Sequence, residues 1–378
     1  MKLARLGDIC TLNYGRSLRG YSPEPDNELP VRVFGTNGPI GWAREALSDE
    51  PTIIIGRKGA YRGVHYSEFP SWTIDTAYYL VLNVSNVELK WLYYRLMLLD
   101  INSMDSGSAI PSTKREDFYS SRVRVPDIDN QRRVVNALSS YDDLIDNNHR
   151  RIQLLEESAQ LLYKEWFVHL RFPGHEHVKI TNGVPEGWEP CLLPHVIEVN
   201  PKERIEKGKE VAYVPMAALS ETNMTVDVSR FEKRNKHTNV KFRQHDVLLA
   251  RITPCLENGK TGYVHFLKED EQACGSTEFI VLRGKRVSSA FVYCLARSEH
   301  FRETAIQSMT GSSGRQRVQA SSLADYSVPL PPQHLLEMFD EVAMQAFEQV
   351  GVLMAQNERL AKARDLLLPK LMSGELAA

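Results

Sequence analysis

Two segments of the chain repeat apolar residues at spacings of three and four, and this pattern restricts the fold more than any other feature of the sequence. In residues 126–166 the repeated positions are Leu138, Tyr141, Ile145, Asn148, Ile152, Leu155, Ala159, Leu162 and Trp166. In residues 331–378 they are Leu336, Phe339, Ala343, Ala346, Val350, Leu353, Asn357, Leu360, Leu367 and Leu371. This spacing is typical of a coiled-coil seam, so each segment is predicted to form a long helix that packs against another helix. Pro369 is expected to break the last turn of the second helix.

Each seam contains one asparagine among its apolar residues, Asn148 in the first and Asn357 in the second. A lone polar residue in a seam can fix the register of two helices at some cost in stability. Alternatively, both asparagines lie on slightly exposed turns. The sequence leaves these two interpretations open.

Short runs of β-branched and aromatic residues fill the segments that lie between the helices. Such runs predict strands, here at residues 31–34, 52–55, 77–82, 247–250 and 279–282. Helical patterns follow each set of strands, at residues 89–99 and 290–301. We therefore expect each of these segments to form a mixed domain of short strands and helices.

The order of strand-rich segment, Gly-Ser turn, proline junction and long helix occurs twice, with a period of about 205 residues. The Gly-Ser turns are Gly107-Ser108 and Gly311-Ser312, and the proline junctions are Val125-Pro126 and Leu330-Pro331-Pro332. A chain of 378 residues also exceeds the usual domain size of roughly 100–200 residues. The predicted fold class is therefore α+β. Two globular domains (1–125 and 167–330) are joined by two long antiparallel coiled-coil helices (126–166 and 331–378), giving a pseudo-two-fold internal repeat.

Common catalytic and metal-binding motifs are not assembled by this sequence. Asn258-Gly-Lys-Thr261 resembles the end of a P-loop, but Pro254 stands where the loop needs a glycine. His175-Glu-His177 is too compact for two zinc ligands on one helix face, and the five cysteines form no CxxC pair. The scattered cysteines favour a reducing cytoplasm, and no apolar run reaches the ~20 residues that span a bilayer. We expect a cytoplasmic protein without a catalytic centre, a metal site or a membrane segment.

Three stretches of the sequence resemble the specificity subunits of type I restriction-modification systems. The first includes Asn130-Gln-Arg-Arg-Val-Val, Asp142-Asp-Leu-Ile-Asp-Asn-Asn148 and Leu161-Leu-Tyr-Lys-Glu-Trp-Phe167. The second includes Asp246-Val-Leu-Leu-Ala-Arg251, Thr253-Pro-Cys-Leu-Glu-Asn-Gly-Lys260 and Gly275-Ser-Thr-Glu-Phe279, and the third is the tail Leu366-Leu-Leu-Pro-Lys-Leu-Met-Ser-Gly-Glu-Leu376. The junction Pro331-Pro-Gln-His-Leu-Leu-Glu337 departs from the family because it lacks the usual Glu-Gln pair.

The resemblance implies a non-catalytic subunit that reads double-stranded DNA. Each of the two domains, called target recognition domains in this family, would read one half of a split target. The helices would space the domains and dock two methyltransferase (modification) subunits, and restriction subunits would join the complex. S-adenosylmethionine, ATP and Mg would be bound by those partners and no cofactor by this chain. The candidate spacer and partner-binding positions are Asn148, Leu155, Trp166, Phe167, Asn357 and Leu360.

Cationic loops that follow predicted strands are the candidate DNA contacts. A net charge of -2 permits this role, because phosphate contact needs only a local basic face. In the first domain, the loop after residues 52–55 supplies Arg57, Lys58, Gly59, Tyr61 and Arg62, and its glycines permit close approach of the backbone to DNA. The segment Ser112–Arg115, which pairs hydroxyl groups with cations, supplies Lys114 and Arg115. The alternatives are an exposed hairpin turn for the loop and a solvated face for the segment.

The second domain supplies a matching set of candidates. They are Arg251, Glu257, Asn258, Lys260, Ser276, Thr277, Arg315 and Arg317. The segment Ser312–Arg317 is expected to match Ser112–Arg115 of the first domain. Glu278 is either a further base contact or a structural cap for a neighbouring loop.

Two other functions compete with the specificity subunit. One is a stand-alone DNA-binding scaffold, or the recognition part of another restriction system, which would bind DNA tightly without a methyltransferase. The other is a coiled-coil interaction protein, which would show no salt-dependent DNA binding.

Overall fold

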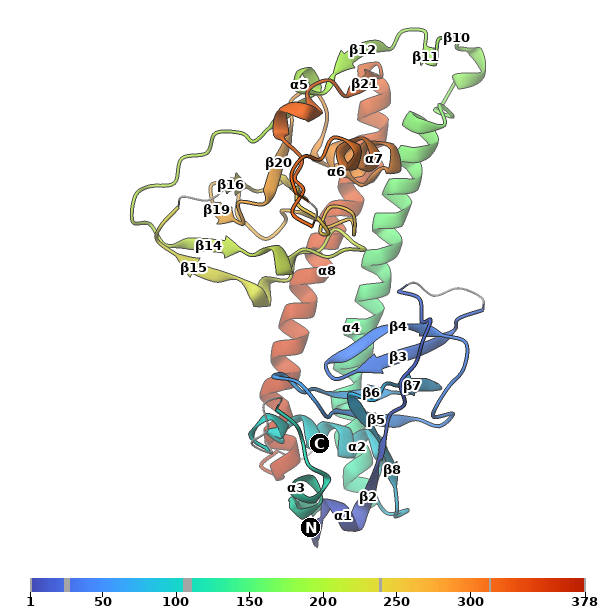
Figure 1. Cartoon of the computed structure of the whole chain (residues 1–378), viewed down its shortest axis with the longest axis vertical. Coiled ribbons are helices and arrows are strands. Elements are labelled where there is room, and N and C mark those ends of the chain that lie inside the picture. The colour runs from blue at the N-terminus through green and yellow to red at the C-terminus, as the bar shows by residue number, and fades with distance from the viewer. Residues whose placement is uncertain (1, 24–27, 105–110, 238–239, 313, 377–378) are drawn as a thin grey trace. The chain divides into compact units, whose positions relative to one another are not determined.

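The computed structural model describes residues 2–23, 28–104, 111–237, 240–312 and 314–376 (Figure 1). Contacts divide the chain into two compact units: unit 1 comprises residues 1–145 and 359–378, and unit 2 comprises residues 146–358. Helices α4 (Ile128–Tyr163) and α8 (Gln333–Ser373) each contribute one part to each unit. The predicted mixture of helices and sheets in two repeated domains is therefore confirmed.

Unit 1 contains a four-stranded antiparallel sheet and a smaller three-stranded sheet. The first has the order β2 (Cys10–Tyr14), β8 (Ala77–Leu82), β5 (Thr52–Gly56), β6 (Val64–Ser67). The second has the order β4 (Gly38–Ala43), β3 (Val31–Gly35), β7 (Ser71–Thr73), and β1 (Lys2–Arg5) pairs with β9 (Arg122–Val125). The short α-helices among its described residues are α1 (Leu6–Ile9), α2 (Leu89–Met97) and α3 (Arg115–Ser120).

The core of unit 1 joins the four-stranded sheet to both long helices. Trp91 and Leu92 of α2 pack with Leu138 of α4 and Leu371 of α8, all of them buried. Arg364 of α8 donates to Asp142 of α4 at 2.6 Å. The first part of α4 and the last part of α8 are thus tied into unit 1.

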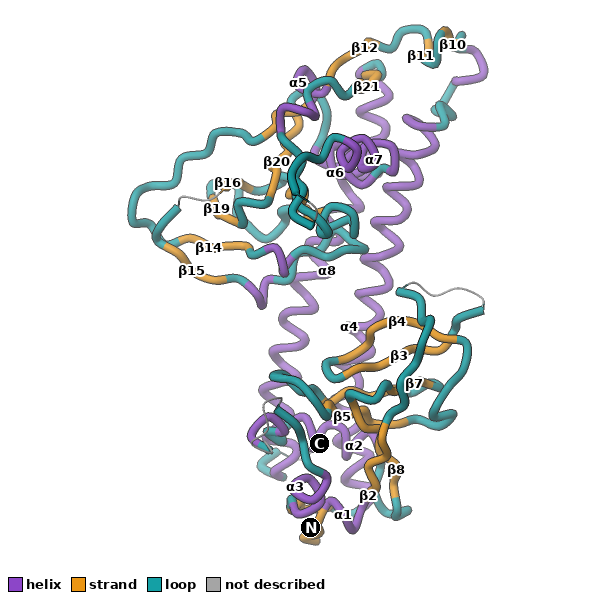
Figure 2. Tube along the Cα trace, in the orientation of Figure 1, coloured by secondary structure: helices purple, strands orange, loops and turns teal. Residues whose placement is uncertain are grey.

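Unit 2 repeats this plan with longer loops (Figure 2). One sheet has the order β13 (Ile197–Val199), β20 (Phe279–Gly284), β17 (Val247–Ala250), β18 (Thr261–Tyr263). Another has the order β15 (Glu232–Arg234), β14 (Val211–Val214), β19 (Gln272–Gly275), β16 (Val240–Arg243). Two small ladders pair β12 (Glu189–Leu192) with β21 (Ser327–Leu330) and β10 (Ile180–Thr181) with β11 (Val184–Pro185). The helices are α5 (Leu193–Val196), α6 (Ser289–Arg297) and α7 (Glu299–Gln307).

The internal repeat is visible in the order of the elements. The run β1, α1, β2 corresponds to β12, α5, β13, and β9 and β21 each lead into a long helix. All five predicted strand segments are strands. The turn Gly107-Ser108, which the repeat was partly based on, lies outside the described residues.

Helix α8 continues through Pro369 to Ser373, so the expectation that this proline breaks the last turn is wrong. A proline removes one hydrogen bond from a helix, a loss that tertiary packing can offset. Leu368, Leu371 and Met372 are buried in the core of unit 1 and hold this turn in place. Within the described residues, no helix is both long and apolar enough to cross a membrane.

The two seam asparagines bond to each other in unit 2. The Nδ2 of Asn148 donates to the Oδ1 of Asn357 at 2.8 Å, and Asn148 is only 3% exposed. The Nδ2 of Asn357 is buried without a hydrogen-bond partner. The structure therefore supports the register-fixing interpretation over exposed turns, at a cost in unsatisfied polar groups.

Replacing Asn148 with leucine is expected to lower the free energy of unfolding of unit 2 by about 1–3 kcal/mol, because Asn357 then has no partner for either polar atom. The double variant N148L/N357L removes both polar groups and is expected to recover most of that loss. Urea denaturation of the single and double variants measures both values. A double variant less stable than either single variant would contradict this account.

Candidate nucleic-acid interface

The loop that follows β5 in unit 1 is held against the segment that precedes α3. Gly56 is required at its start because a Cβ there would lie 2.5 Å from the backbone oxygen of Thr36. The backbone nitrogen of Arg57 donates to the backbone oxygen of Thr76 at 2.9 Å, and the backbone nitrogen of Thr113 donates to the carbonyl of Arg57 at 2.9 Å. Lys58 and Ser112 form a β-bridge. The two predicted cationic segments of the first domain therefore lie side by side.

Two arginines from these segments share one tyrosine ring. The guanidinium carbon of Arg57 lies 5.0 Å from the centre of the Tyr14 ring, and that of Arg115 lies 4.5 Å from it. Tyr14 is 48% exposed and packs on the ring of Tyr78 with 5.2 Å between centres. Burial raises the pKa of Tyr78 to about 12, although both guanidinium groups oppose the shift. We call Tyr14, Arg57, Tyr78 and Arg115 the Tyr14 cluster.

Exposed residues border the Tyr14 cluster. Lys58 and Lys114 are exposed, and Tyr61 is 80% exposed. Gly59 has a φ of +126°, which favours glycine at the bend of the loop. Among the ion pairs of the described residues, none includes Arg57, Lys58, Lys114 or Arg115. Unit 1 thus presents four cations and two exposed aromatic rings on adjoining segments.

Arg62 is not part of this surface, and its assignment as a DNA contact is wrong. Its side chain is buried, and it donates to the backbone oxygens of Gly59 at 3.0 Å and Asn102 at 2.9 Å. The guanidinium group closes the loop from the inside. A run of cations in the sequence does not reveal which of them points inward.

The loop that follows β17 in unit 2 has the same backbone bonds as its counterpart. The backbone nitrogen of Arg251 donates to the backbone oxygen of Glu278 at 3.0 Å, and the backbone nitrogen of Val318 donates to the carbonyl of Arg251 at 2.9 Å. Ile252 and Arg317 form the β-bridge. Arg251 therefore occupies the position of Arg57, and Arg317 occupies that of Ser112.

This correspondence corrects the predicted match between Ser312–Arg317 and Ser112–Arg115. Because Arg317 aligns with Ser112, the residues that align with Lys114 and Arg115 are Gln319 and Ala320. Arg317 itself forms a two-pronged ion pair with Glu278, with an Nη2 to Oε1 distance of 2.9 Å. Glu278 is thus not a free base contact, and its bonds to Arg317 support the alternative of a structural cap for the neighbouring loop.

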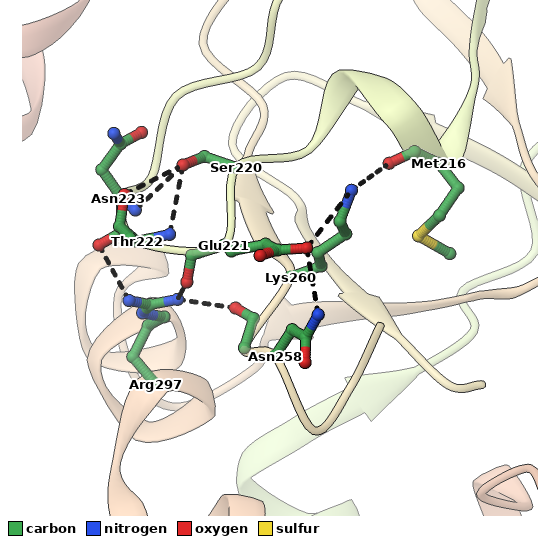
Figure 3. Close-up of polar contacts among 9 residues, drawn as sticks. Met216, Ser220, Glu221, Thr222, Asn223, Asn258, Lys260 and Arg297 are labelled. Atoms are coloured by element: carbon green, nitrogen blue, oxygen red, sulfur yellow. Dashed lines mark hydrogen bonds and ion pairs between the residues drawn. The ribbon is translucent and has the colours of Figure 1, made fainter. Parts of the chain in front are cut away.

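Two more predicted contacts, Asn258 and Lys260, take part in an internal network (Figure 3). Asn258 donates to Glu221 at 3.2 Å, and the Nζ of Lys260 lies 3.9 Å from the same carboxylate, with a side chain only 16% exposed. Arg297 donates to the backbone oxygens of Glu221 and Gly259 at 3.0 and 2.6 Å. The charge of Lys260 is therefore compensated within unit 2, which corrects its assignment as a free base contact, and Asn258 serves to hold two loops together.

The other predicted contacts of unit 2 remain accessible. Glu257, Thr277 and Arg315 are exposed, and the Oγ of Ser276 accepts from the backbone nitrogen of Glu278 at 3.2 Å. Arg251 donates to Gln319 at 3.2 Å, while its Nε is buried without a partner.

The candidate partner-binding residues Trp166 and Phe167 pack against the core of unit 2. They lie in a π-helical turn, Lys164–Val168, and the Phe167 ring is 5.1 Å from both Phe291 and Phe339. Leu155 also packs against the core of unit 2, and Leu360 is half-buried. Trp166 and Phe167 are therefore half-buried residues that pack against the core of unit 2, and their role in binding a partner stays a prediction.

Sequence reasoning missed Tyr14 and the buried carboxylate Glu156. Tyr14 is 43 positions away from Arg57 in the chain and joins it only through the sheet. Glu156, which is 3% exposed, accepts from the nitrogen of Met224 at 2.8 Å and from the hydroxyl of Tyr293. An acidic residue on the apolar side of the first seam is the one signal that could have identified it. Across the described part of the chain, no three His, Cys, Asp or Glu side chains are grouped to hold a metal.

Residues 1–157 and 185–340 match the family described as the type I restriction modification DNA specificity domain. The chain belongs to this family. The resemblance found in the sequence is therefore confirmed, and the repeat corresponds to two matched segments of this specificity family.

Known relatives of the specificity family include two curated subunits. The type I restriction enzyme MjaIX specificity subunit of Methanocaldococcus jannaschii is 24% identical over 388 residues, covering 98% of this chain and 85% of that protein. The type I restriction enzyme EcoEI specificity subunit of Escherichia coli is 32% identical over 157 residues, covering 39% of this chain and 26% of that protein. The crystal structure of the type I restriction-modification S subunit from M. genitalium shares the fold, with a TM-score of 0.57 and 14% identity, covering 98% of this chain and 95% of that one.

Proposed function

We propose that the chain is the DNA-reading subunit of a type I restriction-modification enzyme and that each unit reads one half of a split target. The observation that carries this proposal is the loop that is built twice. In both units an arginine follows a buried central strand, and its backbone is bonded on both sides to the same two neighbouring segments. The arginine at this position is Arg57 in unit 1 and Arg251 in unit 2. Arginine binds guanine edges and phosphates with paired donors, which suits this position.

The proposal includes a spacer and partner subunits. Helices α4 and α8 contain 36 and 41 residues and carry apolar seams, so we assign them to an antiparallel coiled coil that spaces the two readers. Helices of about 40 residues extend about 60 Å, which is enough for two readers placed along DNA. Two methyltransferase subunits and the restriction subunits would supply S-adenosylmethionine, ATP and Mg chemistry in the cytoplasm, and this chain would supply no catalytic group.

Exchanging residues 1–125 for the same segment of a relative with a different target is expected to change one half of the methylated sequence and leave the other half intact. The reason is that residues 1–125, with their sheets and the loop of Arg57, lie within unit 1, whereas the sheets and the loop of Arg251 lie within unit 2. Sequencing of methylated bases in cells that express the chimera, with its methyltransferase, measures the result. A chimera in which both halves change would contradict the two-reader proposal.

Binding assays separate the proposed function from its two alternatives. The purified chain is expected to bind DNA with an affinity that falls as salt rises and that increases when the methyltransferase is added. Tight, sequence-specific binding without a methyltransferase would favour a stand-alone scaffold. The absence of any salt-dependent binding, with or without the methyltransferase, would favour a coiled-coil protein without a DNA function.

A further inference from the structure

The two equivalent loops differ in charge at four positions that the backbone bonds align. In unit 1 these positions hold Arg57, Lys58, Lys114 and Arg115. In unit 2 they hold Arg251, Ile252, Gln319 and Ala320. Four cations of unit 1, two in the loop after β5 and two in the segment at the start of α3, thus correspond to a single cation in unit 2.

The surroundings of these cations increase the difference. The two guanidinium groups on Tyr14 have no ion-pair partner among the described residues, and two like charges so close together repel. In unit 2, the added cation Arg317 is neutralised by Glu278, which stands where unit 1 has Thr76. The Tyr14 cluster therefore lacks an anion, whereas its counterpart already contains one.

The Tyr14 cluster is built so that its donors stay available. The guanidinium carbon of Arg57 lies over the Tyr14 and Tyr78 rings, 5.0 and 5.9 Å from their centres, and its buried Nε has no hydrogen-bond partner among the described residues. Arg115 donates to the carbonyl of Leu12 over a long distance, 3.4 Å. A guanidinium group carries several N–H donors in a planar fork, and donors that no protein group occupies suit a phosphate oxygen.

Resting on the proposed function, we propose that the Tyr14 cluster binds a backbone phosphate of the DNA and that unit 1 supplies most of the ionic contact. Unit 2, with Arg251 as its one aligned cation, contributes mainly contacts that do not depend on salt. A phosphate fits the site better than a base edge, because the cluster needs negative charge and a base edge carries none. Tyr14 acts as a positioning residue, since its ring sets the direction of both arginines.

The test compares the salt dependence of DNA binding for the full chain and its charge variants. The double variant R57Q/R115Q is expected to flatten the slope of log K against log salt by about two, on target and non-target DNA alike. The double variant R315Q/R317Q, which removes two cations from the equivalent region of unit 2, is expected to change that slope by less than one. R44Q is the matched control, because Arg44 is an exposed arginine of unit 1 that is already paired with Glu28.

The lysine variant R57K/R115K keeps both charges and is expected to keep the slope while binding more weakly, which separates lost charge from lost folding. Equal melting temperatures for all variants establish that they fold. A slope that R57Q/R115Q leaves unchanged would overturn the phosphate assignment, as would a loss confined to discrimination between targets. A wild-type chain that shows no salt-dependent DNA binding, even with its methyltransferase, would overturn the proposed function itself.

Discussion

Replacing Asp246 with alanine is expected to lower the free energy of unfolding of unit 2 by about 3 kcal/mol, because it leaves a buried arginine with half of its ionic partners. The carboxylate is 1% exposed and accepts from Nε and Nη2 of Arg283, both at 2.7 Å. It also accepts from the backbone nitrogen of Arg243 at 2.8 Å. The Arg283 side chain, 15% exposed, would retain only Glu203, at 2.7 Å. Urea denaturation followed by circular dichroism measures the change.

Two further variants isolate the reason for this loss. E203Q leaves Asp246 in place and is expected to cost about 1 kcal/mol, because the amide still accepts one hydrogen bond from Arg283. D246L/R283M removes both charges and is expected to be more stable than D246A, since no buried charge then lacks its partner. If D246A lost less than about 1 kcal/mol, the buried ion pair would not be a main support of unit 2.

The fold was largely accessible from the sequence because its main signals are local. The apolar spacing in residues 126–166 and 331–378 identified both long helices, and β-branched runs such as 52–55 and 247–250 identified the central strands. The end of α8 was misjudged because Pro369 is a local signal, whereas the packing of Leu371 is not. Local patterns therefore predict where elements form better than where they end.

The candidate interface was less accessible because side-chain direction depends on distant residues. Arg57 and Arg62 belong to one cationic run, yet only Arg62 turns inward, toward the backbone of Asn102. Lys260 faces Glu221, a residue 39 positions earlier, and this pairing leaves no mark in the spacing. Charge runs therefore indicate where cationic loops lie but not which cations are free within them.

Replacing Glu156 with alanine is expected to cost unit 2 about 2–4 kcal/mol, because the nitrogen of Met224 and the hydroxyl of Tyr293 would both lose a buried acceptor. The carboxylate ties α4 to Met224, which directly follows Ser220–Asn223. Glu221 of that segment accepts from Asn258, as Figure 3 shows. E156A is therefore also expected to weaken recognition by unit 2. A variant that folds with wild-type stability would contradict this role.

The variant E156Q separates the charge of this residue from its hydrogen bonds. Burial raises the pKa of Glu156 above the ordinary value of 4.5, although the bonds from Tyr293 and Met224 oppose the shift. The folded chain therefore binds the proton more tightly than the unfolded chain, so the contribution of Glu156 to stability is greatest below pH 4.5 and falls as pH rises through the folded pKa. E156Q does not ionise, so its stability relative to the wild type is expected to increase across that range and then level off. Urea denaturation of both proteins from pH 4 to 8 measures the difference, and a difference that stays constant would show that Glu156 titrates alike in the folded and unfolded chains.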